Sequence, residues 1–261
     1  MSLPKPVVVI KIGGNEIDDP GFLGRFVAAV HRVQAESLPV IVHGGGKEIA
    51  DLHQRLQVPF EMVQGVRVTS AESLRLVEMV LSGLVNTRVV RWLVNHDIEA
   101  IGLTGVDAGL VQVTRWRPND LDLGYVGKVT AVRAAPLQRL LDAGFVPVIS
   151  PVSLGEDGQT YNVNADHVAA ALAHGLQASR LVFVTNVPGV LVAGRVVRAL
   201  TVAQVEEMID EGLIFGGMIP KVRSAIEAVA AGVYQAVITD LDGLAQAGGT
   251  IILSATMNSE R

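Results

Sequence analysis

The 261-residue sequence contains no cysteine, which excludes disulfides, thiolate nucleophiles and cysteine-ligated metal sites. Aromatic residues make up only 4% of the chain and charged residues 18%, whereas hydrophobic residues make up 49%. This composition predicts a folded protein with a large aliphatic core, because disordered chains are poor in hydrophobic residues. The six histidines lack the spacing of a metal site, so no protein metal ligand is predicted.

Long hydrophobic runs are missing as well. The first apolar run, residues 7–12, has only the length of a strand, and no stretch approaches the length of a membrane-spanning helix. The net charge of −5 argues against nucleic acid or an anionic membrane as the main partner. We therefore expect a soluble, cytoplasmic protein.

Short runs rich in β-branched residues alternate with longer segments of helical periodicity. The predicted strands are 7–12, 39–42, 98–103, 146–150, 181–185 and 236–239. The predicted helices are 22–34, 46–56, 71–95, 136–143, 165–176, 202–210 and 221–231. This alternation predicts an α/β fold, a three-layer αβα sandwich with a mostly parallel central sheet. Ligands of such sheets bind at the edge formed by the carboxyl ends of the strands.

Two segments depart from the alternation. Residues 111–129 are predicted to form a hairpin excursion or lid, and residues 190–197 a second hairpin. The best candidate for a boundary lies near residues 177–180, which divides the chain into lobes 1–178 and 179–261. No internal repeat or low-complexity tract is evident.

Two glycine-rich turns follow predicted strands. Lys11-Ile-Gly-Gly ends the first strand, and His43-Gly-Gly-Gly lies between the second strand and a helix. Glycines at a strand-to-helix turn let backbone amides approach a phosphate, and a helix N-terminus adds a positive dipole end. Neither turn has the Walker A or the dinucleotide-binding pattern. Together they predict a phosphate site, whereas His43 itself is interpreted as structural.

Five motifs occur in order along the chain: Lys11-Ile-Gly-Gly, His43-Gly-Gly-Gly, Gly65-Val-Arg-Val-Thr, Asn162-Val-Asn-Ala-Asp and Gly216-Gly-Met-Ile-Pro-Lys. In order and spacing they resemble the amino-acid kinase family, and within it the acetylglutamate branch, over nearly the whole chain. The resemblance implies the carbamate kinase-like fold. It also implies ATP-dependent phosphorylation of the side-chain carboxylate of N-acetyl-L-glutamate, the second step of arginine biosynthesis.

The resemblance also implies roles for single residues. Lys11 would contact the transferring γ-phosphoryl group, Lys221 would stabilise the leaving ADP, and Asp166 would hold both ammonium groups in place. Phosphoryl transfer needs spread negative charge neutralised at fixed positions, which this set supplies. The amides of Gly13, Gly14 and Gly44 would bind phosphoryl oxygens, and the substrate would approach Gly45 and Gly46. Mg²⁺ would accompany ATP, held mainly by phosphates and water.

Substrate and nucleotide contacts follow from the same resemblance. Arg67 suits the α-carboxylate of the substrate because a guanidinium binds two oxygens at once, and Asn162 would bind the same end. Read without the family, Arg67 is a surface ion pair, Asn162 a turn residue and Asp166 a helix N-cap. The 179–261 lobe would bind the nucleotide through Asn186, Gly189, Leu213, Ile214, Phe215 and Gly217. Asn186 stands where the family usually has aspartate.

The predicted helix 71–95 carries an apolar stripe of Leu74, Val77, Leu81, Leu84 and Val85, which is either core or a dimer seam. The resemblance implies a homodimer through this helix. Few residues precede the first predicted strand, so the extra N-terminal helix of hexameric, arginine-inhibited relatives is expected to be absent. We expect a homodimer that arginine does not inhibit.

Three alternative functions stay open. The chain could phosphorylate carrier-bound aminoadipate or glutamate, for which Arg115, Arg117 and Lys128 would supply a basic surface. The acyl group could be succinyl, since the sequence does not define the acyl pocket. A silent nucleotide or amino-acid sensor is the non-enzymatic alternative, against which both lysines and Asp166 are present.

Overall fold

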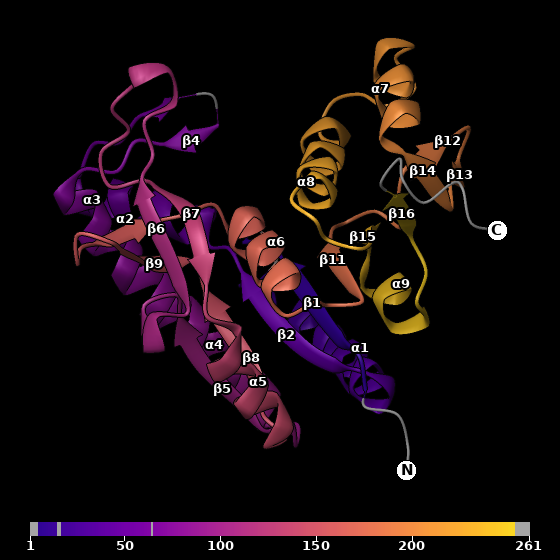
Figure 1. Ribbon diagram of the computed structural model, residues 1–261, viewed down its shortest axis with the longest axis horizontal. Helices are drawn as coiled ribbons and strands as arrows, with labels where there is room; N and C mark the ends of the chain where they lie inside the picture. The colour runs from indigo at the N-terminus through magenta and orange to yellow at the C-terminus, as the bar shows by residue number, and fades with distance from the viewer. Residues whose placement is uncertain (1–4, 15–16, 64, 254–261) are drawn as a thin grey trace.

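The fold is built on an eight-stranded sheet with the strand order β14-β16-β15-β11-β1-β2-β8-β5, shown in Figure 1. The computed structural model describes residues 5–14, 17–63 and 65–253. In chain order the strands are β1 (Val7–Ile12), β2 (Leu38–His43), β5 (Ala100–Thr104), β8 (Val146–Ser150), β11 (Arg180–Val184), β14 (Ala199–Thr201), β15 (Ala236–Thr239) and β16 (Thr250–Leu253). Every pair from β15 to β5 is parallel, whereas β16 is antiparallel to β15. The predicted mostly parallel sheet is confirmed.

Helices cover both faces of this sheet. One hydrophobic cluster joins the sheet to α1 (Pro20–Glu36), α2 (Gly46–Leu56), α3 (Ala71–Glu78), the π-helix η1 (Met79–Val85), α4 (Asn86–Val94) and α9 (Leu241–Gln246). A second cluster joins the opposite face to α5 (Ala134–Asp142), α6 (Ala165–Gly175), α7 (Val202–Asp210) and α8 (Met218–Ala230). The predicted three-layer αβα sandwich is therefore confirmed.

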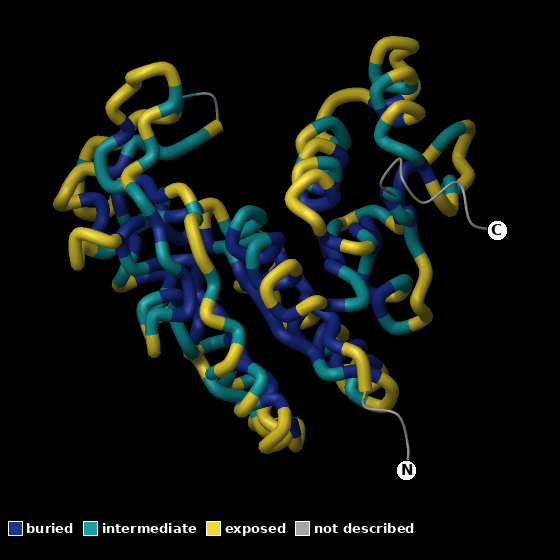
Figure 2. Tube along the Cα trace, in the orientation of Figure 1, coloured by how far each residue is buried: buried dark blue, intermediate teal, exposed yellow. Residues whose placement is uncertain are grey.

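The central strand β1 shows how the sequence produces this arrangement. Val7 and Val9 belong to the cluster under α6 and α8, whereas Val8, Ile10 and Ile12 belong to the cluster under α1. A strand buried on both faces needs a continuous apolar run, and β1 is buried at every position except Lys11, which is partly exposed (Figure 2). Because side chains alternate along a strand, Lys11 lies on the face of Val7 and Val9, toward α6 and α8.

A smaller sheet with the order β10-β9-β6-β7 stands beside the main one. Its strands are β6 (Val111–Arg115), β7 (Gly127–Val132), β9 (Val152–Gly155) and β10 (Thr160–Asn162), and β6 pairs antiparallel with β7. This pairing confirms the hairpin predicted over 111–129. Two further hairpins join β3 (Met62–Val63) to β4 (Val66–Arg67) and β12 (Leu191–Val192) to β13 (Arg195–Val196), so the 190–197 hairpin is confirmed too. Short 3₁₀ turns, η2 (Asp107–Gly109) and η3 (Pro118–Asp120), lie in the connections.

The long predicted helix 71–95 is interrupted by a turn of π-helix. It is divided into α3, η1 and α4, because η1 is wound more loosely than an α-helix. The predicted stripe splits accordingly: Leu74, Val77, Leu81 and Val85 are buried, whereas Leu84 is 51% exposed. Four of the five stripe residues are thus core residues, and Leu84 is not.

The main sheet runs without a break across the predicted boundary at residues 177–180. Strand β1 pairs with β2 on one side and with β11 on the other. The division into lobes 1–178 and 179–261 stays a prediction. Within the described part of the chain, no helix combines the length and the apolar character needed to cross a membrane.

Candidate active site

The end of β1 carries an ion pair that joins the sheet to two helices. Lys11 Nζ lies 2.9 Å from Asp166 Oδ1, on α6. The other carboxylate oxygen, Oδ2, accepts a hydrogen bond of 2.8 Å from Ser224 Oγ on α8. The side chains of Lys11 and Asp166 are only 20% and 19% exposed, so water screens this pair less than a surface pair. Asp166, on α6, thus connects the central strand to α8 as well.

The N-terminus of α6 explains why Asp166 is available for this role. Asn164 is the N-cap residue, and its Oδ1 accepts a hydrogen bond of 2.8 Å from the backbone N–H of Asp166. The interpretation of Asp166 as the N-cap is therefore wrong. An aspartate in the first turn still gains from the positive end of the helix dipole.

Lys221 lies in the first turns of α8, one turn before Ser224. Its Nζ donates a hydrogen bond of 2.8 Å to Asn186 Oδ1, which follows the end of β11. The unusual Asn186 is thus a neutral partner for this ammonium group. Ser224 itself was not singled out from the sequence, because a serine at this spacing has no signature of its own.

The two glycine turns touch each other at the carboxyl edge of β1 and β2. A Cβ atom added to Gly14 would lie 2.6 Å from Gly45 N and 2.9 Å from Gly46 N, so no side chain fits at position 14. Gly45 is confined for another reason, since its added Cβ would lie 2.6 Å from Leu81 Cδ2. Position 46 faces open space. Of the predicted substrate-contact glycines, only Gly46 therefore has room beside it.

The amide of Gly44 is already in use. It donates a hydrogen bond of 3.1 Å to Ile12 O, in continuation of the β1–β2 ladder. The prediction that this amide binds a phosphoryl oxygen is therefore corrected, because a backbone N–H offers one hydrogen. Gly13 and Gly14 remain the amide candidates of the first turn, and both are partly exposed.

His43, at the base of this turn, is buried and neutral. Its Nδ1 donates to Gly44 O over 2.9 Å, and its Nε2 accepts from Asn86 Nδ2 over 3.1 Å. The same amide nitrogen donates to Val148 O over 2.9 Å, which fixes the orientation of Asn86. Complete burial lowers the pKa of His43 from 6.5 to about 4. These contacts agree with the structural role predicted for His43.

Helix α2 begins within the second glycine turn, and helix α8 begins one turn before Lys221. Their N-cap residues are Gly45 and Gly217, and neither has a side chain to cap the helix. An uncapped N-terminus presents backbone N–H groups and a positive dipole end, which suits an anion. The first turn of α2 is anchored by Glu48, a buried carboxylate 2.8 Å from Arg88 Nη1 on α4.

Arg67, at the end of β4, lies beside Gly46. Its Nη2 donates weakly to Gly46 O over 3.4 Å, and its Cζ lies 4.0 Å from the centre of the Phe60 ring. Its Nη1 is buried without a hydrogen-bond partner among the described residues. Partial burial lowers the pKa of Arg67 from its usual value, although the guanidinium remains charged. No acidic partner satisfies it, so the interpretation as a surface ion pair does not hold in the described chain.

Asn162 belongs to the same corner. Its Nδ2 donates to Thr69 Oγ1 over 3.1 Å, and this hydroxyl donates to Arg67 O over 2.9 Å. The structure therefore brings the predicted substrate residues Arg67 and Asn162 together through Thr69. The interpretation of Asn162 as a turn residue required contacts within its own turn. Its side chain instead contacts Thr69 in a neighbouring segment.

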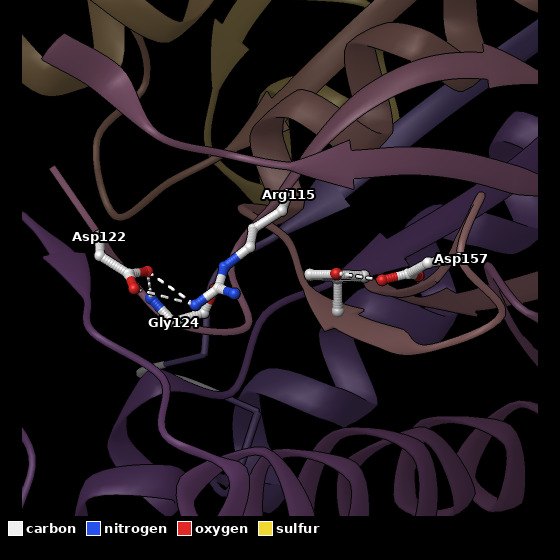
Figure 3. Close-up of polar contacts among 5 residues, drawn as sticks. Arg115, Asp122, Gly124 and Asp157 are labelled. Atoms are coloured by element: carbon white, nitrogen blue, oxygen red, sulfur yellow. Dashed lines mark hydrogen bonds and ion pairs between the residues drawn. The ribbon is translucent and has the colours of Figure 1, made fainter. Parts of the chain in front are cut away.

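The loop that follows β6 is closed by Arg115, as Figure 3 shows. Its Nε donates to Gly124 O over 2.9 Å, and its Nη2 lies 2.8 Å from Asp122 Oδ1. The hydrogen bond from the backbone N–H of Gly124 lowers the pKa of the Asp122 carboxyl, and the nearby charge of Arg115 lowers it as well. Trp116, the next residue, packs edge-on against His167, with 6.4 Å between the ring centres. The predicted lid is therefore tied internally and rests on α6 next to Asp166.

The predicted nucleotide residues fall into two groups, those that are open to a ligand and those that are buried. Asn186 lines a cavity of about 200 Å³ together with Arg25, Thr185 and Asp240. Leu213 and Phe215 are 42% and 73% exposed and are available to a ligand. The side chain of Ile214 lies in the core and is only 2% exposed, and Gly189 is buried against Thr250. Their positions therefore do not support the predicted nucleotide contacts of these two residues. Gly217 has open space beside it.

The site offers no cluster of protein metal ligands. Among the described residues, no three histidine or acidic side chains come together in a way that could hold an ion. Asp166 has one oxygen facing Lys11 and the other facing Ser224. A magnesium ion would therefore fit here only as the partner of nucleotide phosphates and water, which is its usual mode of binding.

Comparison with known proteins adds to this geometry. A model described as the amino acid kinase family matches residues 6–240. An acetylglutamate kinase of Roseiflexus sp. (strain RS-1) is 51% identical over 251 residues, which cover 95% of this chain and 94% of that protein.

Solved structures show the same fold. The structure of smu.665 from Streptococcus mutans UA159 has a TM-score of 0.78 at 34% identity and covers 95% of this chain and 98% of that one. A carbamate kinase from Giardia lamblia has a TM-score of 0.70 at 16% identity, over 96% of this chain and 99% of that one. The chain belongs to the amino acid kinase family.

Proposed function

We propose that this protein is an ATP-dependent kinase that phosphorylates the side-chain carboxylate of N-acetyl-L-glutamate. The observation that carries the proposal is the contact chain from Lys11 through Asp166 to Ser224, which joins the phosphate turns to the helix of Lys221. The relative from Roseiflexus is named acetylglutamate kinase, and the match extends over nearly all of both chains. That name supports N-acetylglutamate as the substrate and a place in arginine biosynthesis.

The reaction needs no general base. A side-chain carboxylate has a reference pKa near 4.3, so it is ionised at neutral pH and attacks the γ-phosphorus directly. The bond from the γ-phosphorus to the bridging oxygen breaks, and ADP leaves with that electron pair. The difficulty is to hold two anions in line, because they repel each other. Both ring nitrogens of neutral His43 are hydrogen-bonded, to Gly44 and to Asn86, so His43 is not available as a base.

Cationic groups would neutralise the charge that spreads during transfer. Lys11 would bind the transferring group from β1, and Lys221 would bind the bridging oxygen from α8. Asp166 would orient Lys11 and hold α8 close through Ser224. The N-terminus of α2 and the amides of Gly13 and Gly14 would add hydrogen-bond donors. Magnesium would enter with ATP and offset the charge of its phosphates.

Arg67 would bind the α-carboxylate of the substrate, and Asn162 would complete that pocket. The support is the Nη1 of Arg67, which has no partner within the described part of the chain, and the position of its side chain beside Gly46, where the glycine turn leaves open space. A carboxylate would supply the missing acceptor in a bidentate pair. The nucleotide base would lie near Leu213 and Phe215, in the 179–261 lobe.

The alternative of a carrier-bound substrate is weakened by the lid. Arg115, which would have supplied part of a basic docking surface, is paired with Asp122 and with Gly124 O. An N-succinylated substrate differs only in the acyl group and is one of the acceptors to be assayed.

A homodimer through the helices that span residues 71–95 belongs to the proposal. A cytoplasmic location belongs to it as well. Exposed Met79 and Leu84 support the dimer.

The test is coupled ADP release with N-acetylglutamate, glutamate, aspartate, aminoadipate and N-succinylglutamate in parallel. We expect turnover with N-acetylglutamate to exceed that with every other acceptor. Lys11→Ala and Lys221→Ala should each reduce kcat by two orders of magnitude or more, roughly the contribution of one charged transition-state contact. Lys5→Ala is the matched control, since its ammonium donates a hydrogen bond to Gln34 O at the end of α1. Equal turnover of both lysine variants and the control would overturn the mechanism.

A further inference from the structure

The guanidinium of Arg67 rests on an aromatic ring. Phe60 lies in the segment between α2 and β3, and its ring centre is 4.0 Å from Arg67 Cζ. A cation over the face of a ring is attracted to it, and the contact also restricts the guanidinium plane. Phe60 keeps 40% of its surface exposed while its ring faces the guanidinium.

The ring of Phe60 is held in turn by His53. The two ring centres are 5.0 Å apart at an angle of 69°, an edge-to-face contact. His53 is only 1% exposed, and both ring nitrogens are engaged. Its Nδ1 donates to Ile49 O over 2.8 Å, so its Nε2 accepts from Ser73 Oγ over 2.8 Å. His53 therefore has one fixed orientation between α2 and α3.

These contacts return to the helix that begins at the glycine turn. Ile49 and His53 lie on α2, and Arg67 Nη2 donates to Gly46 O at the first residue of the same helix. Two parts of α2 therefore set the position of the guanidinium. Gly46 contacts it directly, and His53 acts on it through the ring of Phe60. Nη1 of Arg67 is buried and has no hydrogen-bond partner among the residues that the structure describes, which costs free energy unless a ligand supplies an acceptor.

We propose that Phe60 and His53 are positioning residues that hold Arg67 in the orientation in which it binds the α-carboxylate of the acceptor. The inference rests on the proposed function, because it takes Arg67 as the acceptor-binding cation. With one face against Phe60, the guanidinium presents its edge, and a bidentate carboxylate approaches in that plane. Loss of the ring frees the guanidinium to rotate, and affinity for the acceptor falls while the phosphate site is unchanged.

The experiment is a double-mutant cycle on Phe60 and Arg67. Phe60→Leu should raise KM for N-acetylglutamate about fivefold and leave kcat and KM for ATP near the wild-type values. Phe60→Trp restores an aromatic face and should return KM to within about twofold of wild type. In an Arg67→Ala background, Phe60→Leu should have no further effect, because the residue acts through Arg67. Phe145→Leu, also a partly exposed phenylalanine, is the matched control.

Each contrary outcome has a distinct meaning. If Arg67→Ala raises KM for the acceptor but Phe60→Leu does not, the inference fails and the proposed function stands. If Phe60→Leu changes KM by the same factor with and without Arg67, Phe60 acts only on the fold, and the inference fails. If Arg67→Ala leaves KM for the acceptor unchanged, the acceptor assignment of the proposed function fails together with the inference.

Discussion

At the scale of single residues, Asp166 and His43 show how burial and partners assign roles. Asp166 could have capped α6, yet Asn164 takes that place, and both carboxylate oxygens are free to bind Lys11 and Ser224. His43 could have been a base, yet both its nitrogens are engaged in a buried network. The motifs identify which residues matter, but the partners decide which chemistry each can perform.

The buried His43 predicts a pH dependence of stability. Its pKa is about 4 in the folded chain, against 6.5 when exposed. As pH falls below 6.5 the unfolded chain binds a proton that the folded chain does not, so the free energy of unfolding decreases. The loss continues until about pH 4 and amounts to about 3 kcal/mol in total. Denaturant unfolding between pH 7.5 and 4.5 measures it.

The control for this prediction is His43→Gln, which keeps polar atoms but cannot be protonated in this range. We expect the variant to be less stable than wild type at pH 7.5 and to show a shallower decline toward acid. Parallel declines in the two proteins would mean that other groups cause the acid sensitivity.

At the scale of elements, the contact between the two glycine turns is a constraint on both. Gly14→Ala would place a methyl group within 2.6–2.9 Å of the backbone at Gly45 and Gly46. We expect a destabilisation on the order of 2 kcal/mol and a loss of kcat of more than tenfold, because the turns must separate. Thermal unfolding and coupled ADP release measure the two effects.

Gly24→Ala is the matched control for this substitution. Gly24 lies inside α1, and its added Cβ would be 4.0 Å from Trp92, an ordinary contact distance. Alanine is the better helix former by roughly 0.5–1 kcal/mol, so this variant should be as stable as wild type or more stable. A Gly14→Ala protein with wild-type activity and melting temperature would contradict the tight contact.

The elements also show where prediction from sequence reaches its limit. The strands predicted at 7–12, 146–150 and 236–239 coincide with β1, β8 and β15, because strands buried on both faces are continuous apolar runs. Strand β16 and helix α9 were not predicted, since they are short and have little periodicity. The π-helix η1 also went unseen, because apolar spacing does not distinguish it from an α-helix.

The candidate site was predictable to a different extent. The pairing of Lys11 with Asp166 follows from motifs that family resemblance connects, although they are far apart in the chain. Ser224 and Phe60 lie outside those motifs, and only the folded structure places them beside Asp166 and Arg67. Local sequence could not separate buried Ile214 from its exposed neighbours, because all three are equally hydrophobic.

At the scale of the whole molecule, exposed apolar residues predict self-association. Met79 and Leu84 on η1 are 62% and 51% exposed, and such side chains on one face are typical of an interface. We expect wild-type protein to have the mass of a dimer by light scattering. Leu84→Glu should shift the mass to that of a monomer, since it would bury two carboxylates at a two-fold axis.

Leu191→Glu is the control, because Leu191 has a similar exposure of 40% but lies on the β12–β13 hairpin. Its mass should equal that of wild type. A wild-type monomer, or a dimer that survives Leu84→Glu at micromolar concentration, would refute an interface on η1.

The two-sided pairing of β1 has a consequence for motion. Lys11 sits on a strand bonded to β2 and β11, so it cannot travel without breaking the middle of the sheet. Its counterpart Lys221 sits on α8, which packs on this face of the sheet through Val222, Ala225, Ala228 and Val229 and is joined to Asp166 by the hydroxyl of Ser224. We therefore expect Lys11 to keep a fixed position, and substitutions that loosen the packing of α8 to slow phosphoryl transfer through Lys221 without changing the affinity for the acceptor.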